Sequence, residues 1–417
     1  MTQKIIREFN GSSQLHCGSL KMHATGERYY KVNRILLKTL GLWPYQQSYF
    51  SRIHKTLFVS LLLTFILVQL LVFVTTQYNT NLLLKIFSFA FPALFVTIKI
   101  DCISTIELRE IWNEQVKKML EQMRDDWRLL KDKLEVDIIE KYAYNLQFST
   151  IISIVIGLFC SFLLIILQFL PLILDVILPL NESRPFQAFA ITEYFFNQEK
   201  YIYIILLHEI LAYSIGIIAL YGTFITIMIY IWHACALLKI TSYRIENAIE
   251  KSALAIPVFE RHFLFYQKIV HAVLIHRRAI KFAKLITSNF TLLFAILIIV
   301  GVSSLSINLL QITLINDSTE DACIVTTFIV IHLSYMFIVN YGGQKVTDHG
   351  MELYKAIYNG LWYAAPLHIQ KLLLFMMKRG NINVTSIFGG LYEVSLEGFA
   401  SLTNAAVSYF MVMYSTR

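Results

Sequence analysis

The sequence predicts an all-helical membrane protein with seven transmembrane helices, a cytoplasmic N-terminus and an extracellular C-terminus. Hydrophobic residues make up 56% of the 417 residues and charged residues only 15%, whereas about a quarter of a soluble domain is charged. Several uncharged apolar stretches are as long as the roughly 20 residues that a helix needs to cross a membrane core of about 30 Å. Lys and Arg are concentrated in alternate connections between these stretches, which predicts the orientation.

Each expected span is a largely apolar stretch with polar or charged residues at its ends. The first 53 residues contain eight Lys or Arg and no apolar core of a signal peptide, so we expect the first span to insert itself. Lys85 and Lys99 lie near the ends of the second span, where a long side chain reaches the headgroups. The spans are expected at residues 57–76, 82–104, 142–174, 201–233, 285–311, 323–341 and 386–414.

The basic residues fix which ends of the spans face the cytoplasm. Of the 36 Lys and Arg residues, 32 lie in the N-terminal arm and in the connections 99–147, 233–284 and 342–385. Short cytoplasmic connections are enriched in these residues, so these four segments are expected inside the cell. This orientation is opposite to that of a G-protein-coupled receptor. The net charge of +8 follows from membrane topology, and we expect contact with membrane lipid but no nucleic-acid partner.

The chain therefore divides into segments by its predicted position relative to the membrane. We expect a cytoplasmic arm at 1–56, six spans within 57–341, a cytoplasmic segment at 342–385, a last span at 386–414 and an extracellular end at 415–417. The connections at 105–147 and 234–284 are nearly free of Gly and Pro and mix both charge signs with apolar residues. We predict that they are helical extensions that pack together as a cytoplasmic domain.

Motifs typical of enzymes are incomplete. His208 and Glu209 begin like a zinc-binding helix, but the second histidine of that motif is missing, and the sequence has no glycine loop that could cradle a phosphate. The five cysteines have no metal-ligand spacing. We expect no catalysis, no metal and no cofactor. An ionisable residue within an apolar stretch indicates a functional site, but His208 could equally reach water at the interface.

Aromatic and small polar residues are frequent in the outer halves of the spans. The second span carries phenylalanine at 87, 89 and 91. Apolar cavities with a few polar groups bind small ligands, although ordinary helix packing is the better interpretation of any single residue. The candidates that we select for ligand contact are Phe87, Phe91, Ser161, Phe162, His208, Tyr213, Phe328, His332 and Tyr335.

The last span has features of a pore-lining helix. Glu393 and Glu397 are four residues apart, which would place both on one face of a helix, and carboxylates along a water-filled path attract cations. Small, polar and apolar residues suited to a narrow pore follow at Ser408, Met411, Val412 and Ser415. The alternative is that both glutamates are interfacial groups bonded to neighbouring helices, and the sequence leaves the two interpretations open.

Three stretches of the chain resemble the insect odorant receptor family. The last helix ends in Ser408-Tyr409-Phe410-Met411-Val412, which is similar to that family's terminal signature. A segment before the first span, Gly41-Leu42-Trp43-Pro44-Tyr45, is also similar. The third stretch matches in order and spacing through Tyr358, Trp362, Tyr363, Pro366, Lys371, Arg379, Gly389, Gly390, Ser395, Leu396, Glu397 and Phe399.

The resemblance implies an odorant-gated, non-selective cation channel in the plasma membrane of an olfactory neuron dendrite. It implies four subunits, with the last helices around a central pore and the segment 342–385 as an anchor between subunits. It also implies a pocket for a small volatile between spans two to six. The co-receptor of this family has Thr-Tyr-Phe-Met-Val at the terminal signature, so its gate valine corresponds to Val412. The chain lacks the co-receptor's long insertion, which implies a ligand-tuned subunit that assembles with the co-receptor.

Other classes of membrane protein fit less well. A gustatory-type receptor channel would end in a Gln-Phe pair, and a G-protein-coupled receptor would have the opposite topology and its own motifs. A transporter built from inverted halves would show an internal repeat. Asn181 begins an Asn-Glu-Ser acceptor in a predicted extracellular loop, so we expect glycosylation there.

Overall fold

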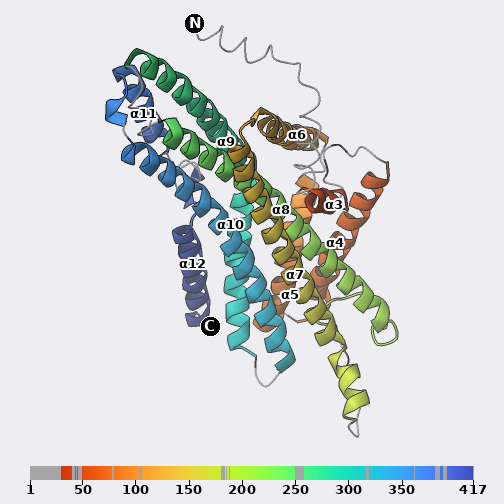
Figure 1. Cartoon of the computed structure of the whole chain (residues 1–417). Coiled ribbons are helices and arrows are strands. Elements are labelled where there is room, and N and C mark those ends of the chain that lie inside the picture. The colour runs from red at the N-terminus through yellow and green to blue at the C-terminus, as the bar shows by residue number, and fades with distance from the viewer. Residues whose placement is uncertain are drawn as a thin grey trace.

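The computed structural model describes a bundle of long helices inclined along a common direction (Figure 1). The described residues are 30–39, 43, 45, 49–77, 79–102, 106–179, 184, 186, 188–248, 258–315, 319–360, 362–380, 386–387 and 392–416. The prediction of an all-helical membrane protein is confirmed. A two-stranded antiparallel ladder is the one addition within these residues.

The helices follow one another along the chain, and the connection between α7 and α8 covers residues 178–201. Their bounds are α3 Lys31–Thr39, α4 Tyr49–Thr75, α5 Thr80–Cys102, α6 Ile106–Leu129, α7 Lys133–Ile177, α8 Ile202–Ala248, α9 Val258–Thr313, α10 Thr319–Asn359, α11 Leu367–Gly380 and α12 Leu396–Ser415. A short 3-10 helix, Trp362–Ala364, precedes α11, and the strands β1 (Ser386–Ile387) and β2 (Tyr392–Glu393) precede α12.

Five helices among the described residues are long and apolar enough to cross a membrane. They correspond to predicted spans one, three, four, five and six and lie at Thr56–Thr75, Lys133–Ile177, Ile202–Ala248, Phe294–Thr313 and Asp321–Asn359. Within α5, the second predicted span, a shorter apolar helix covers Leu82–Phe91. The seventh, α12, has 20 residues but is less apolar because serine, threonine and asparagine interrupt it. The count of seven spans and their orientation stay predictions.

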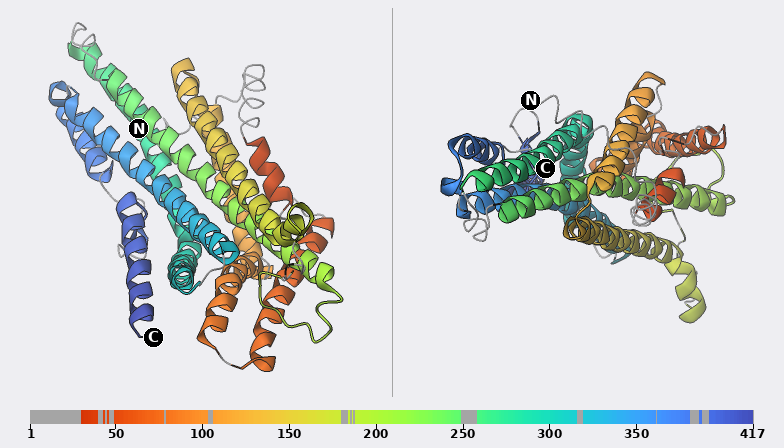
Figure 2. Two further views of the ribbon diagram at one scale, coloured as in Figure 1. Left: turned by 90° about the horizontal axis from the view of Figure 1, so that it is seen from below. Right: turned by 45° about the horizontal axis from the view of Figure 1, so that its top comes forward.

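Several helices continue well beyond the length that a membrane requires. The helices α7, α8 and α9 have 45, 47 and 56 residues, whereas about 20 residues span the hydrocarbon core. The extensions lie at the end of the bundle that the sequence predicts to be cytoplasmic. Figures 1 and 2 show α8, α9 and α10 side by side over much of their length.

Buried charges join the extensions to one another. The Asp126 carboxylate of α6 accepts a hydrogen bond from Arg278 of α9 and lies 3.0 Å from Nε2 of His233 in α8. Arg244 of α8 donates to both carboxylate oxygens of Glu135 in α7, at 2.5 and 2.8 Å. Removing one partner of such a pair leaves an uncompensated buried charge. These contacts therefore fix how α6, α7, α8 and α9 pack.

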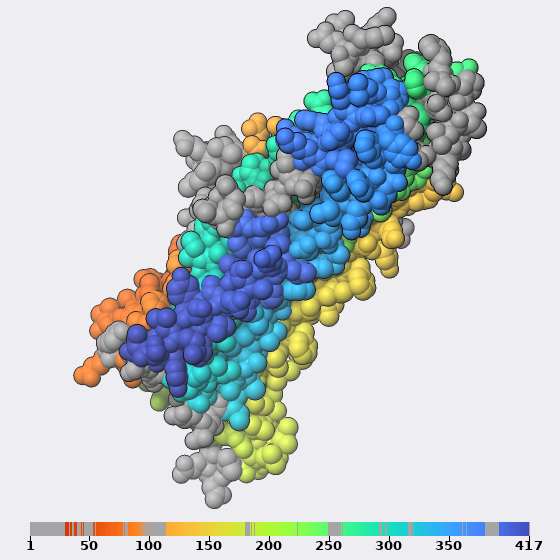
Figure 3. Space-filling view, turned by 90° about the vertical axis from the view of Figure 1, so that its left-hand side faces the viewer, coloured from red at the N-terminus to blue at the C-terminus, as the bar shows by residue number. Residues whose placement is uncertain are grey.

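The last helix begins ten residues later than the sequence predicts. The Ser395 side chain accepts a hydrogen bond from the Gly398 backbone N–H at 3.0 Å, which caps α12 at this point. Glu393 lies before this cap, in β2. The prediction that Glu393 and Glu397 share one helix face is therefore wrong. Figure 3 shows α12 lying along the outside of the bundle.

Candidate functional site

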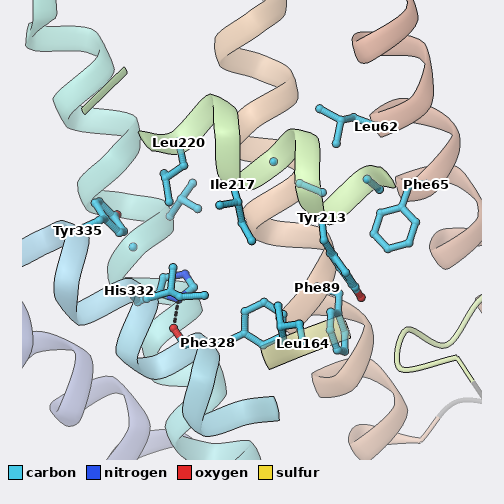
Figure 4. Close-up of a pocket in the computed structure, with 16 residues that line it drawn as sticks. Leu62, Phe65, Phe89, Leu164, Tyr213, Ile217, Leu220, Phe328, His332 and Tyr335 are labelled. Carbon is cyan, nitrogen blue, oxygen red and sulfur yellow. Dashed lines mark hydrogen bonds between the residues drawn. The ribbon is translucent and has the colours of Figure 1, made fainter. Parts of the chain in front are cut away.

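An internal cavity lies between six helices of the bundle. The space within its lining, counting any part that opens outward, is about 790 Å³. We call it the ligand cavity (Figure 4). Its lining residues come from α4, α5, α7, α8, α9 and α10: Leu62, Phe65, Phe89, Ala93, Leu164, Ala212, Tyr213, Gly216, Ile217, Leu220, Val300, Gly301, Phe328, Ile331, His332 and Tyr335.

Aromatic rings from four helices meet at the wall of this cavity. Phe89 of α5 and Phe328 of α10 meet edge to face with centroids 5.1 Å apart. The Tyr213 ring of α8 lies 5.8 Å from that of Phe89 and 5.5 Å from that of Phe65 in α4. Such rings offer apolar surface with defined shape. The cavity can therefore hold a small apolar molecule, mainly through hydrophobic burial.

One imidazole gives the cavity a defined polar group. Nδ1 of His332 lies 2.7 Å from the carbonyl oxygen of Phe328, as the dashed line in Figure 4 shows. A carbonyl oxygen only accepts, so Nδ1 carries the proton and Nε2 is left as an acceptor. The ring also lies 6.1 Å from that of Tyr335. A ligand with one hydroxyl group could donate a hydrogen bond to Nε2.

His208 and Glu209 hold the loop between α7 and α8 against the bundle. The buried Glu209 carboxylate accepts from the Ala190 backbone N–H and from the Tyr213 hydroxyl, both at 2.8 Å. The His208 ring lies 2.7 Å from the Tyr194 hydroxyl through Nδ1 and 3.1 Å from the hydroxyl of Thr64 through Nε2. Tyr213 thus connects this loop directly to the cavity wall.

The structure brings only part of the selected residues to the ligand cavity. Tyr213, Phe328, His332 and Tyr335 line it, and Ser161 lines a smaller neighbouring cavity. Phe87 and Phe91 instead pack with residues of α9 and α12. The Phe162 side chain is 62% exposed on the outside of α7. His208 contacts the loop between α7 and α8. Four of the selected residues therefore lie outside both cavities: Phe87, Phe91, Phe162 and His208.

Several lining residues were not selected from the sequence. Phe89 lies in the noted run of alternate phenylalanines, and helical spacing separates it from Phe87 and Phe91, which share a face with ring centroids 5.1 Å apart. Leu62 and Phe65 belong to α4, which the resemblance did not include in the pocket. Gly216 and Gly301 are small residues inside apolar helices, a signal of close packing or open space.

The helix α12 has one packed face and one exposed face. The packed residues recur every three or four positions and contact α5, α9 and α10 through Phe399, Leu402, Ala406, Phe410 and Met413. The opposite face is exposed, and we call it the polar stripe: Glu397, Ser401, Asn404, Ser408, Val412 and Ser415. Met411 is also exposed beside it. Five of the six predicted pore residues therefore lie on or beside the exposed face, and Glu393 does not.

The helix α12 is held by two helices that also form the wall of the ligand cavity. Ser306 of α9 donates a hydrogen bond to the carbonyl oxygen of Ala406 in α12 at 2.9 Å. The Tyr392 hydroxyl, just before α12, donates to Asn340 of α10 at 2.6 Å. An added Cβ at Gly343 of α10 would lie 2.0 Å from the Val394 carbonyl oxygen, so only glycine permits this approach.

The predicted glycosylation site, Asn181, lies outside the described residues.

The fold and the ligand cavity define a polytopic helical membrane protein with an internal apolar binding space. A family model described as 7tm Odorant receptor matches residues 86–407. The chain belongs to this odorant receptor family, which confirms the resemblance seen in the sequence.

Sequence and structure relatives agree with this membership. The chain is 31% identical over 90 residues to Odorant receptor 10 of Aedes albopictus, covering 22% of this chain and 24% of that protein. It is 28% identical over 105 residues to Odorant receptor Or2 of Anopheles gambiae, covering 25% and 28%. The chain thus spans about a quarter of the length of these curated relatives in the matched regions.

The fold is similar to that of a solved insect receptor. The olfactory receptor OR5 from Machilis hrabei superimposes with a TM-score of 0.74 at 15% identity, covering 95% of this chain and 100% of that chain. Its structure in complex with eugenol gives a TM-score of 0.72. At this identity the likeness concerns the fold.

Proposed function

We propose that this chain is a ligand-tuned odorant receptor subunit that binds a small, mostly apolar volatile and gates a non-selective cation pore. The observation that carries the proposal is that α9 and α10 line the ligand cavity and also hold α12. A change in the packing of the cavity wall is thereby passed to the helix with the exposed polar stripe. The olfactory receptor OR5, solved with eugenol, has the same fold.

The ligand acts by favouring one packing of the wall helices. Occupancy can shift a closed–open equilibrium only as far as the ligand binds the open state more tightly. Phe328 and His332 contact the ligand cavity, and Asn340 holds the start of α12 two turns further along the same helix. Movement of α10 relative to α8 therefore displaces the start of α12. Movement of α9 displaces the middle of α12 through the hydrogen bond of Ser306.

The polar stripe of α12 is the surface that would face the ion path. Serine and asparagine side chains favour a hydrated path, and the Glu397 carboxylate attracts cations at one end. Val412 is the large apolar residue of the stripe and is 59% exposed. We propose that Val412 and the corresponding side chains of the other subunits form the hydrophobic constriction of a tetramer. Last helices of the co-receptor would complete the ring.

The surface also supports assembly with other subunits in the plasma membrane of an olfactory neuron dendrite. On α11, Leu374 and Phe375 are each 58% exposed at the end predicted to be cytoplasmic. On α12, Tyr409 is 61% exposed beside the polar stripe. Exposed apolar residues at both ends of one side of the bundle are typical of subunit contacts. The segment 342–385 would serve as the anchor between subunits.

Current recordings test the proposal. Cells would express the chain alone, with the co-receptor, and with the co-receptor plus Val412→Ala, during exposure to a panel of volatiles. We expect an odour-evoked cation current that requires the co-receptor and a larger leak current in the Val412→Ala variant. Val407→Ala is the control, because Val407 is exposed on α12 but outside the polar stripe. A response carried only through G proteins would overturn the channel function.

A further inference from the structure

A second, smaller cavity lies between α7 and α8, directly beside the ligand cavity. The space within its lining, counting any part that opens outward, is about 290 Å³, and we call it the annex. Leu164, Tyr213 and Ile217 line both cavities. A single layer of side chains therefore separates the annex from the ligand cavity.

The lining of the annex is more polar than that of the ligand cavity. Four of its nine lining residues carry polar side chains: Ser161, Gln168, Tyr213 and Ser214. In the ligand cavity, three of sixteen lining residues do so. At this depth in an apolar bundle a polar group is costly without a hydrogen-bond partner. Gln168 already donates to the Glu209 carboxylate at 3.4 Å, so the groups left to meet a polar part of a ligand are the hydroxyls of Ser161, Tyr213 and Ser214.

The hydrogen bonds already present in the annex determine which kind of polar group of a ligand can bind there. The Ser161 hydroxyl donates to the Gly157 carbonyl oxygen at 2.8 Å, and the Tyr213 hydroxyl donates to Glu209 at 2.8 Å. Both oxygens keep lone pairs, so they can accept a further hydrogen bond. The Ser214 hydroxyl can rotate to donate or accept. A hydroxyl group of a ligand can donate its one proton to the oxygen of Ser161 or of Tyr213 and accept from Ser214, which makes two hydrogen bonds, whereas an ether oxygen can only accept from Ser214, which makes one.

We propose that the annex is a subsite for the terminal hydroxyl group of an odorant whose apolar part occupies the ligand cavity. This inference rests on the proposed odorant function and adds the chemical class of the ligand, a primary alcohol. The hydroxyl end would enter the annex when the Leu164 and Ile217 side chains, which line both spaces, change rotamer. Tyr213 lines both spaces and so belongs to both parts of the site.

A series of alcohols and their methyl ethers tests the subsite. The probes are 1-hexanol, 1-octanol and 1-decanol, each compared with its methyl ether, on cells expressing the chain with the co-receptor. For the preferred chain length we expect the alcohol to act at about tenfold lower concentration than its ether, the worth of one to two hydrogen bonds. In a Ser161→Ala plus Ser214→Ala variant the alcohol should lose most of this advantage, because it loses more hydrogen bonds than the ether does.

The control is Thr327→Ala, because Thr327 is a buried α10 hydroxyl that bonds the Cys323 carbonyl oxygen and lines neither cavity. Thermal stabilisation of the purified chain by the same probes gives a second readout that does not depend on current. Equal potency of alcohol and ether, or an alcohol preference that survives in the double variant, overturns the subsite but leaves the receptor function intact. A series in which no compound stabilises the chain or evokes current also overturns the subsite for primary alcohols, whereas the receptor function is tested separately by the wider panel of volatiles.

Discussion

The hydroxyl oxygen of Ser306 lies 2.9 Å from the carbonyl oxygen of Ala406, which joins a helix of the cavity wall to the helix with the polar stripe. Both residues are buried, and the hydroxyl also lies 2.7 Å from the Val302 carbonyl oxygen one turn earlier in α9. Ala406 is the centre of the packed face of α12. Displacement of α9 at this point therefore moves α12 directly.

Ser306→Ala should weaken this connection without changing the ligand cavity. Loss of a hydrogen bond worth about 1 kcal/mol should raise the odorant concentration for half-maximal current about fivefold. Binding, measured as thermal stabilisation of the purified chain by the odorant, should stay unchanged because Ser306 does not line the cavity. Thr313→Ala is the matched control, since the Thr313 hydroxyl bonds only the Leu310 carbonyl oxygen of its own helix. A parallel loss of binding would contradict the assignment.

The fold class and the long helices were predictable because they depend on hydropathy and on the distribution of Lys and Arg, and both can be read from the sequence alone. The start of α12 was not, since it depends on the Ser395 cap and on the short strand pairing of Ser386 with Glu393. Sequence spacing placed both glutamates on one helix face only on the assumption that the helix already included Glu393. The hydrogen bond of the Ser395 cap instead begins the helix after Glu393.

The cavity residues were predictable by type more than by position. Aromatic residues in the outer halves of the spans indicated a pocket, but which of them line it depends on how each helix is rotated in the bundle. Phe89 faces the cavity, and Phe87 and Phe91, two positions away on either side, face α9 and α12. Because a helix repeats about every 3.6 residues, Phe89 faces a different direction from Phe87 and Phe91. Only the packing of α5 shows which set is inside.

Two glycines of the ligand cavity should respond differently to an added methyl group. A Cβ at Gly216 meets nothing within 4 Å, whereas a Cβ at Gly301 would lie 2.3 Å from the Tyr335 hydroxyl oxygen. Gly216→Ala should fold normally and weaken the response to the largest odorants by about tenfold or more, the usual worth of one misplaced methylene. Gly301→Ala should displace the Tyr335 ring and change the ranking of odorants. Dose–response curves over a size-graded panel measure both, and an identical profile for the two variants would refute the proposed cavity shape.

His276 should make the stability of the chain sensitive to acid. Burial, and then the positive charge of Arg379, lower the pKa of His276 from the usual 6.5 to about 4. Between these two values the unfolded chain binds a proton that the folded chain does not, so the folded state loses stability as the pH falls from 6.5 toward 4. Above pH 6.5 this contribution is fully present.

The measurement is the midpoint of thermal unfolding at about pH 7.5 and about pH 5, where the proton linkage differs most. His276→Gln should reduce the loss of thermal stability on acidification, because glutamine does not titrate. His54→Gln is the control, since His54 is exposed. An equal acid sensitivity of the wild type and the His276→Gln variant would show that other groups cause it.

Glu209 should stabilise the loop between α7 and α8 rather than contact a ligand. Glu209→Ala leaves the Ala190 N–H and the Tyr213 hydroxyl without their acceptor in a buried place, which costs about 1–3 kcal/mol. We expect faster proteolysis at residues 188–200 and a lower midpoint of thermal unfolding. Glu209→Gln should restore much of both, because its amide oxygen still accepts, and Glu199→Ala should change neither, since Glu199 is exposed. If Glu209→Ala instead abolished odorant binding while the loop stayed resistant to protease, Glu209 would belong to the ligand site itself.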